Sequence, residues 1–437
     1  MELIEKVLSA SNLTEACKEV LVNKGAAGID GMQVSELKPY LDENRDKLTS
    51  IIRKSSYIPQ AIRGKEIPKG NGKTRLLGIP TVIDRMLQQA VMRVLMPKYE
   101  YIFSDYSYGF RPLRNTHQAI EKSLSYIHSD YQHIVEIDLK GFFDEVNHVL
   151  LLQILYRKIK CKATMCLLRR WLRAPMQIKG KLEKRRKGVP QGSPISPLLS
   201  NILLHEFDNE MQRNRIKFVR YADDFSIYCK TKSEAKRVGN YIYLYLKNKL
   251  KLPINRDKSG IRRPSSFQIL GYGLTSVFKK GSKGRFQLIV IEKKWKSLKA
   301  KLKMITRKTA PMSFDERIVK LNYVVRGWIN YFKYANIQQK LKYLDSWLRD
   351  RLRYCIWHDW KKSERKRKNL IRLGVKQGMA YAWSRSRMGG WAIAQSPILR
   401  TTITLKRLQK RGYKSLLDVY KLVSPVYKYK NSLFPMI

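Results

Sequence analysis

The stretch Phe218-Val-Arg-Tyr-Ala-Asp-Asp-Phe-Ser-Ile-Tyr228 places two adjacent carboxylates, Asp223 and Asp224, between two short apolar runs. Asp is a poor strand former, whereas the flanking aromatic and β-branched residues favour strands. The pattern therefore predicts a β-hairpin with the two acids at its tip. Such carboxylates repel each other unless a cation lies between them, and Mg²⁺ prefers oxygen ligands. A solvated turn is the alternative, so a chemical role needs a second signal.

The upstream segment His133-Ile-Val-Glu-Ile-Asp-Leu-Lys-Gly141 supplies that signal, because a β-branched run ends at Asp138 and breaks at Gly141. A strand of this kind beside the hairpin would gather three acids in a small space, which a bound metal makes tolerable. A pair of divalent ions held there can stabilise both the attacking and the leaving oxygens of a phosphoryl transfer.

Two further motifs flank the hairpin in the sequence. Between Asp138 and the hairpin lies Gly188-Val-Pro-Gln-Gly-Ser-Pro-Ile-Ser-Pro-Leu-Leu-Ser-Asn201, and after the hairpin lies Asn255-Arg-Asp-Lys-Ser-Gly260. Together with Tyr-Ala-Asp-Asp and the strand that ends in Asp138, they resemble the palm of a reverse transcriptase. Within that superfamily the chain resembles the bacterial group II intron reverse transcriptases, or maturases, from about Asn12 to about Tyr420.

The resemblance implies an α+β fold of the right-hand polymerase type, with a mixed α/β fingers and palm, an antiparallel palm sheet and an α-helical thumb. We expect an N-terminal extension and fingers over 1–85, and the palm with the remaining fingers elements over 86–285. A helical thumb, or maturase domain, is expected over 286–400, and a basic C-terminal tail over 401–437.

The resemblance also implies the catalytic machinery of such an enzyme. Asp138, Asp223 and Asp224 would hold two Mg²⁺ ions, for which Mn²⁺ is a possible substitute, and the backbone carbonyl of Leu139 would complete the metal shell. Lys258 occupies the motif position from which a lysine protonates or neutralises the pyrophosphate leaving group.

A basic hairpin is predicted across Gly70-Asn-Gly72, because Asn-Gly between alternating runs is a strong hairpin signal. It places Lys69 and Arg75 on paired strands, where the family holds the phosphates of the incoming nucleotide. A solvated basic hairpin is the alternative.

Two further residues are expected at the nucleotide. Gln191 lies in the Gly/Pro-rich loop and offers a donor and an acceptor, in the form that ordinary polymerising relatives have. Phe143 matches the aromatic residue that lies under the sugar and excludes a 2′-hydroxyl by sterics. The alternative is that Phe142 or Phe143 is a core residue.

Upstream, apolar residues recur at helical spacing from Thr81 until Pro97, which is predicted to interrupt the helix.

The formal net charge of +53, from 88 basic and 35 acidic residues, calls for a polyanionic partner, and nucleic acid is the expected one. No apolar run approaches the length of a membrane-spanning helix, and the N-terminus lacks a basic leader before an apolar stretch, so a cytoplasmic protein is expected. The five cysteines form no C-x-x-C pair. The cysteines are therefore predicted to be buried free thiols, and no Cys/His-rich endonuclease domain is expected.

Much of the charge lies in the last third of the chain. Residues 291–437 hold 36 Lys and Arg against 8 Asp and Glu, a net +28, together with seven of the eight tryptophans. Basic residues interleaved with aromatics predict a helical bundle whose apolar stripes pack and whose basic faces bind phosphates. The basic tail is expected to anchor RNA without being needed for the fold of the thumb.

The sequence thus predicts an RNA-directed DNA polymerase of a group II intron that also binds the intron RNA to assist splicing and mobility. Its partners would be the intron RNA template, a DNA or RNA primer, deoxynucleotide triphosphates and target DNA, with no membrane. One alternative is a related reverse transcriptase domesticated for phage defence or spacer acquisition. The other is an RNA-binding splicing factor with an unused active site, which the three carboxylates disfavour.

Overall fold

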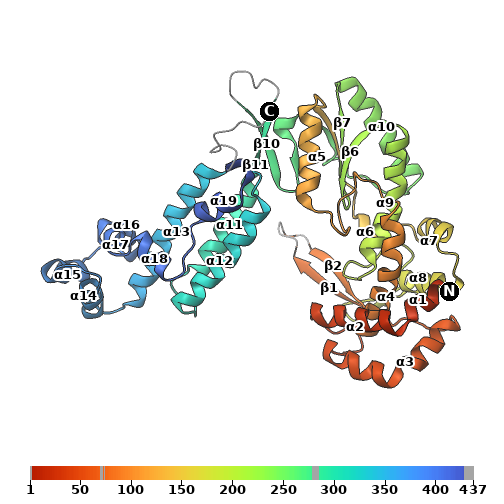
Figure 1. Ribbon diagram of the computed structural model, residues 1–437, viewed down its shortest axis with the longest axis horizontal. Coiled ribbons are helices and arrows are strands. Elements are labelled where there is room, and N and C mark those ends of the chain that lie inside the picture. The colour runs from red at the N-terminus through yellow and green to blue at the C-terminus, as the bar shows by residue number, and fades with distance from the viewer. Residues whose placement is uncertain (1, 69–71, 73, 278–284, 428–437) are drawn as a thin grey trace. The chain divides into compact units, whose positions relative to one another are not determined.

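The computed structural model describes residues 2–68, 72, 74–277 and 285–427. The chain forms two compact units, Met1–Pro264 and Ser265–Ile437 (Figure 1). Among the described residues, no helix has both the length and the apolar character that crossing a bilayer requires.

The first unit contains ten α-helices and eight strands in its described part. The helices are α1 (Leu3–Leu8), α2 (Ala10–Asn23), α3 (Leu37–Arg53), α4 (Val82–Glu100), α5 (Thr116–His128), α6 (Phe142–Glu145), α7 (His148–Lys158), α8 (Lys162–Arg173), α9 (Ser196–Arg213) and α10 (Lys232–Asn248), with a short 3₁₀ turn at Val34–Glu36. The strands are β1 (Ile62–Pro68), β2 (Thr74–Ile79), β3 (His133–Ile137), β4 (Met176–Ile178), β5 (Lys181–Glu183), β6 (Lys217–Tyr221), β7 (Asp224–Cys229) and β8 (Gly260–Arg262).

The palm sheet has the strand order β6-β7-β3-β8, and every neighbouring pair in it is antiparallel, as predicted. Its central strands, β3 and β7, carry apolar residues on both faces, for example Ile134, Val135 and Ile227, all buried. Helix α5 packs on β6, and α10 packs on β3 and β7. The sheet therefore presents the end of β3 beside the β6–β7 turn.

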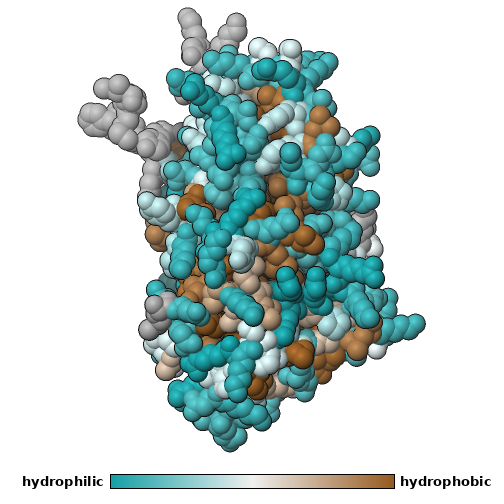
Figure 2. Space-filling view, turned by 90° about the vertical axis from the view of Figure 1, so that its right-hand side faces the viewer, coloured by the Kyte–Doolittle hydropathy of each residue, from teal (hydrophilic) through white to brown (hydrophobic). Residues whose placement is uncertain are grey.

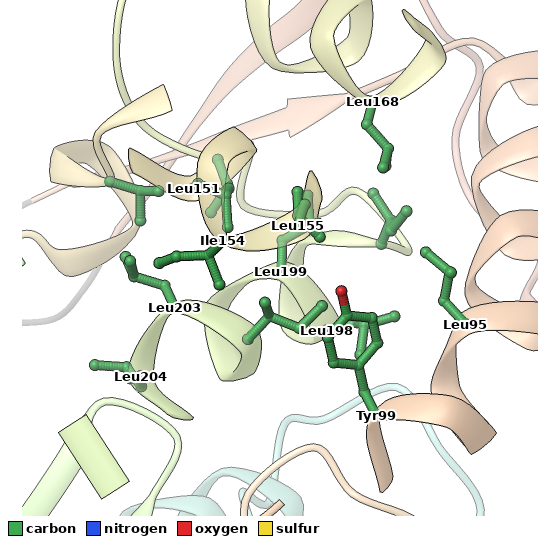
Figure 3. Packing of buried hydrophobic residues seen from close by; sticks show 14 of the residues in the cluster. Leu95, Tyr99, Leu151, Ile154, Leu155, Leu168, Leu198, Leu199, Leu203 and Leu204 are labelled. Atoms are coloured by element: carbon green, nitrogen blue, oxygen red, sulfur yellow. The ribbon is translucent and has the colours of Figure 1, made fainter. Parts of the chain in front are cut away.

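The core of the first unit lies among α4, α7, α8 and α9. Leu residues from these helices interdigitate there, including Leu95, Leu151, Leu168 and Leu199 (Figure 3). Each fully buried Leu side chain contributes about 1.5–3 kcal/mol relative to exposure. This packing fixes the helices that support the palm sheet.

Pro97 does not end its helix, so the prediction of an interruption there is wrong. Helix α4 continues through Pro97 to Glu100. The proline removes one backbone donor close to the C-terminal end of the helix, where little of the hydrogen-bond ladder remains to be lost. Leu95 and Tyr99, on either side of it, are both buried and hold the last turn in the core.

A second sheet, which carries the predicted nucleotide clamp, has the strand order β2-β1-β4-β5. Strands β1 and β2 pair antiparallel from Arg63↔Ile79 to Pro68↔Thr74, which confirms the hairpin, although most of its turn lies outside the described residues. Strand β1 is parallel to β4 through Ile62↔Met176.

The second unit begins with a small antiparallel sheet of order β11-β10-β9 and continues in helices. Its described elements are β9 (Gln268–Ile269), β10 (Tyr272–Ser276), β11 (Phe286–Val290), α11 (Glu292–Ile305), α12 (Phe314–Tyr331), α13 (Gln338–Asp359), α14 (Ser363–Arg372), α15 (Gln377–Ser384), α16 (Gly390–Gln395), α17 (Pro397–Thr402), α18 (Leu405–Lys410) and α19 (Leu416–Val423). Because β10 pairs with β11, the compact unit begins at Ser265, before the expected palm boundary at residue 285.

Residues 405–423 lie within the expected basic tail (401–437), which was predicted not to be needed for the fold of the thumb. They pack into the second unit. Helix α19 packs on α12 and α13, and Leu416 and Tyr420 on it are buried. The buried carboxylate of Asp345 accepts hydrogen bonds from Tyr413 Oη (3.0 Å) and Ser415 Oγ (2.7 Å). It also accepts from the first backbone N–H groups of α19, those of Leu416 (2.8 Å) and Leu417 (2.9 Å). The segment is therefore part of the fold of this unit.

Candidate active site

The acidic hairpin has the predicted form. Tyr221 pairs with Asp224 across β6 and β7, so Ala222 and Asp223 make a two-residue turn. Ala222 has φ of +57°, in the left-handed region that an L-residue with a Cβ adopts at a cost. Something must therefore hold this turn in place.

A buried ion pair between Arg220 and Asp208 fixes the position of the turn. Arg220, fully buried on β6, donates from Nε and Nη2 to the two carboxylate oxygens of Asp208 on α9 at 2.7 and 2.5 Å. Its Nη1 donates to the backbone carbonyl of Ala222 at 2.9 Å and to Oδ1 of Asn201 at 3.0 Å. The guanidinium fork thus ties the turn to helix α9.

Gly109 closes over the same turn. A Cβ atom on Gly109 would lie 2.3 Å from the backbone nitrogen of Ala222 and 3.0 Å from its Cα. The carbonyl of Gly109 accepts a hydrogen bond from Asn201 Nδ2 at 2.8 Å, so the close approach is fixed from both sides. Only glycine fits here, because the obstructing atoms are backbone.

Asp138 follows β3 and is held by the Asn255–Gly260 motif. Asn255 Nδ2 donates to Asp138 Oδ2 at 3.0 Å, and the backbone N–H of Asp138 donates to Ser259 Oγ at 3.1 Å. Lys258 Nζ lies 3.7 Å from Asp138 Oδ2, so the predicted leaving-group lysine is beside the predicted metal ligand. The motif therefore orients one carboxylate and brings a positive charge to it.

Leu139 is fixed through the residues on both sides of it. The carbonyl of Asp138 accepts from Asn255 N at 2.8 Å, and Lys140 N donates to the carbonyl of Pro253 at 2.9 Å. The bridge between Leu139 and Ile254 completes this short ladder. The backbone at Leu139 is thus rigid, as a carbonyl ligand of a metal requires.

Burial, together with neighbouring charges, perturbs the acidic groups Asp223 and Asp224. Burial of its carboxyl group, followed by the charges of Asp223 and Asp138, raises the pKa of Asp224 to about 6. Burial also raises the pKa of Asp223, while the charge of Arg75 opposes the rise. Glu136 on β3 has a pKa raised by burial and only partly restored by Arg262. The ionised forms of these buried acids are therefore disfavoured as long as no cation is bound beside them.

A hard divalent cation would stabilise the ionised form of these acids, and carboxylate oxygens are its preferred ligands. Within the described ranges, no three acidic, His or Cys side chains already stand together as a coordination shell. Mutual repulsion keeps carboxylates apart when no cation lies between them. The chemistry of the three aspartates fits divalent ions.

The β1–β2 hairpin and the Gly188–Pro197 loop, both predicted to contact the nucleotide, are joined to each other. Gly78 N on β2 donates to the carbonyl of Gln191 at 2.7 Å, which joins the loop to the hairpin. Arg75 on β2 is exposed, and its charge reaches Asp223. Lys69, the other predicted clamp residue, lies outside the described residues. Gln191 and Arg75 therefore belong to one connected surface near the acidic hairpin.

The two phenylalanines after Asp138 differ in burial, and one of them is a core residue, which is the alternative that the sequence left open. Phe142 is buried in the core, whereas Phe143 is only partly buried. Their rings meet edge to face at 5.3 Å. The carbonyl of Phe143 accepts from Val189 N at 2.7 Å, which places Phe143 beside the loop that carries Gln191. The assignment of Phe143 as the steric gate stays a prediction.

Phe143→Ala is expected to admit ribonucleotides, because removal of the phenyl ring removes the steric clash with a 2′-hydroxyl. The measurement is the ratio of incorporation efficiencies for dGTP and GTP, with Phe142→Leu as a variant of the core ring. An unchanged ratio in Phe143→Ala would make Phe143 a packing residue and place the gate elsewhere.

The pKa of Asp224 predicts how metal binding depends on pH. The carboxyl is protonated below about pH 6 in the metal-free protein, so protons and divalent ions compete for it. The apparent affinity for Mg²⁺ in primer extension is expected to rise steeply from pH 5 to 7 and to level off above. A profile that is flat across this range in the parent would contradict the assignment of Asp224 as a metal ligand.

Several residues that support the site were missed from the sequence. Asn255 and Ser259 lie inside a quoted motif, and their spacing around Lys258 was the available signal. Arg220 stands between Val219 and Tyr221 in the acidic hairpin, where a charged residue on a buried strand was a second signal.

Comparison with known proteins gives two family matches. Residues 67–274 match the family "Reverse transcriptase (RNA-dependent DNA polymerase)", and residues 295–374 match "Group II intron, maturase-specific domain". The first match contains the acidic hairpin, Asp138 and the Gln191 loop. The second covers the start of the helical part of the second unit.

The chain is also similar to individual proteins. "Protein YkfC" of Escherichia coli is 33% identical over 62% of this chain and 82% of its own length. "Group II intron-encoded protein LtrA" of Lactococcus lactis is 30% identical over 59% of this chain, but the chain spans only 54% of LtrA. Among solved structures, telomerase from Candida albicans aligns with 80% of this chain and 69% of its own, at 13% identity and a TM-score of 0.43.

Proposed function

Because the chain belongs to the family of group II intron reverse transcriptases and maturases, we propose that it copies RNA into DNA and binds its intron RNA to assist splicing and mobility. The observation that carries the polymerase part is the acidic site, where the antiparallel pairing of β3 with β7 brings the end of β3, which Asp138 follows, beside the turn that carries Asp223 and Asp224. The maturase part is supported by the second family match and by the positive charge of residues 291–437.

In this proposal a primer 3′-oxygen attacks the α-phosphate of a deoxynucleotide triphosphate. Asp138, Asp223 and Asp224, with the carbonyl of Leu139, would hold two Mg²⁺ ions, which when bound supply fixed positive charge for the reacting phosphate oxygens. The ion pair between Arg220 and Asp208 keeps the turn that carries Asp223 from relaxing. Asn255 orients the carboxylate of Asp138.

The cations of the chain act on the triphosphate. Arg75, on the exposed side of β2, is placed to hold phosphate oxygens and is near enough to affect Asp223. Lys258, whose side chain is 68% exposed, is free to move from Asp138 to the departing pyrophosphate, where it can neutralise charge or donate a proton. Gln191 lies on the loop that is hydrogen-bonded to β2.

The surface suits a polyanionic partner. Figure 2 shows one face on which hydrophilic residues predominate, with apolar patches between them. A net charge of +53 attracts RNA over the whole molecule, and each phosphate contact releases counterions. We infer that RNA template, primer and target DNA are the partners.

Extension of a DNA primer on an RNA template, with dNTPs and Mg²⁺, tests the polymerase part. Splicing of the intron RNA that flanks the reading frame, with and without the protein at low Mg²⁺, tests the maturase part. Absence of extension by the parent protein would refute the first. Splicing that is unaffected by the protein would refute the second.

A further inference from the structure

A basic cavity lies in the first unit apart from the acidic site. Its volume is about 600 Å³. It is lined by four cations from the end of α8 and the segment after β5, namely Arg173, Lys184, Arg185 and Arg186, and by no acidic residue. The remaining lining comes from the first residues of α7 and from Pro175 and Leu182. A cavity of this size is within the range of ligand sites.

Three of the four cations of the cavity have no carboxylate partner among the described residues. In the part of the chain that the structure describes, no carboxylate lies within ion-pair distance of Arg173, Lys184 or Arg186, all of which are exposed, and the nearby Glu145 pairs with Lys187 instead. Arg185 is partly buried, and burial lowers its pKa, although the charge of Asp144 partly offsets this. The cavity therefore has an unbalanced positive charge that an anion would neutralise.

One donor of Arg185 is committed and another is not. Nη2 donates to the carbonyl of Gly188 at 2.7 Å. Nη1 is buried and has no hydrogen-bond partner among the described residues. A buried unpaired guanidinium donor is unfavourable, and a bound ion or water is the usual explanation. Because Arg185 lines the cavity, an anion bound there would supply such a partner.

His148 adds an acceptor at the same place. Its Nε2 lies 2.7 Å from the carbonyl of Gly188, so that nitrogen carries the proton and donates. Burial lowers the pKa of His148, which keeps the ring neutral at pH 7. Nδ1 is then an acceptor, and it too has no hydrogen-bond partner among the described residues. The cavity thus combines anion-binding cations with one buried acceptor that requires a hydroxyl or water donor.

The walls suit a sugar or a base as well as a phosphate. Leu182 and Val149 expose 63% and 61% of their surfaces. Single-stranded nucleic acid is held where positive charge along the backbone lies next to apolar or aromatic platforms. RNA presents a 2′-hydroxyl donor next to each phosphate, and DNA does not.

We propose that this cavity binds the phosphodiester backbone of an RNA strand, with the cations on the phosphates and His148 Nδ1 on a ribose hydroxyl. The proposal rests on the proposed function, because it adds a second RNA contact to the polymerase. It also has a structural link to the acidic site. The carbonyl of Gly188 is held by Arg185 and His148, while Gly188 N donates to Val146 O at 2.7 Å at the start of the Gln191 loop.

The test removes the three exposed cations together, as Arg173→Gln, Lys184→Gln and Arg186→Gln, and leaves the more buried Arg185 and His148 in place. The matched control replaces three exposed lysines along and just after α10, as Lys232→Gln, Lys247→Gln and Lys249→Gln, with the same loss of charge. Fluorescence anisotropy then gives the affinity for an unstructured 20-nucleotide RNA at several salt concentrations.

The cavity variant is expected to bind RNA about tenfold more weakly, and its salt slope to fall by about 2, from three lost contacts of about 0.7 each. The control is expected to keep the parent's slope. A folded RNA hairpin, run in parallel, distinguishes two sources of the phosphate. A loss with the unstructured strand identifies a template strand, a loss with the hairpin alone identifies structured intron RNA, and either supports the proposal.

Three results would overturn the proposal. The first is equal slopes for the cavity variant and the control with both RNAs. The second is an equal loss for a DNA strand of the same sequence, which would remove the assignment to RNA. The third is thermal stabilisation of the parent, but not the variant, by inorganic phosphate together with an unchanged RNA slope. Extension of a primer–template with a one-nucleotide overhang reports the polymerase separately, since the three aspartates are unchanged.

Discussion

Primer extension by Asp223→Asn is expected to fall at least about a hundredfold, which is the size of the loss when one group that stabilises transition-state charge is removed. Asp223 forms the turn of the hairpin with Ala222, and its charge acts on Asp224. An amide keeps the shape of the side chain but removes the negative charge that binds a divalent ion. RNA affinity should be nearly unchanged, because the basic surface is untouched.

The matched control is Asp257→Asn, the same chemical change at an exposed residue within the Asn255–Gly260 motif. It is expected to extend primers at the parent's rate. Extension by Asp223→Asn within tenfold of the parent, in a protein of unchanged melting temperature, would remove Asp223 from the metal site.

A second large effect is expected from Gly109→Ala, far from Asp223 in sequence. The added methyl group would stand 2.3 Å from the backbone nitrogen of Ala222, so either the turn or the Gly109 segment must move. Displacement of a catalytic group by about 1 Å can cost about a hundredfold in rate. We therefore expect a loss of that size in extension, with RNA binding retained.

Gly239→Ala on α10 is the control, because its Cβ would meet the two methyl groups of Val135 at ordinary contact distances of 3.4 and 3.9 Å. In a helix interior this change should stabilise the protein by up to about 1 kcal/mol. Melting temperatures for both variants separate a moved turn from an unfolded protein. Full extension by a folded Gly109→Ala variant would show that the turn tolerates displacement.

The sequence was sufficient for features that depend on local pattern. The β6–β7 hairpin, the strand before Asp138 and the β1–β2 hairpin were each predicted from alternating residues bounded by turn formers, and the structure confirms them. Local pattern succeeds there because side-chain alternation and turn chemistry are set by neighbouring residues.

The supports of the site could not be predicted in the same way. Arg220 acts through Asp208 and Asn201, which lie on another element, and Gly109 acts through a contact with a turn 113 residues away. Such pairs appear only when tertiary packing brings the segments together. The extent of α4 beyond Pro97 has the same cause, since burial of Tyr99 outweighs the local effect of the proline.

The hydrogen bonds to Asp345 imply that the two units complete their folding at different times during translation. The first unit consists of residues up to Pro264, so it can emerge from the ribosome and fold while the rest of the chain is still being translated. Asp345 receives its donors only after Tyr413 to Leu417 have emerged. Until then its carboxylate must stay hydrated, because burying it without partners is costly. A nascent chain stalled before Tyr413 should therefore carry a folded polymerase unit followed by protease-sensitive helices.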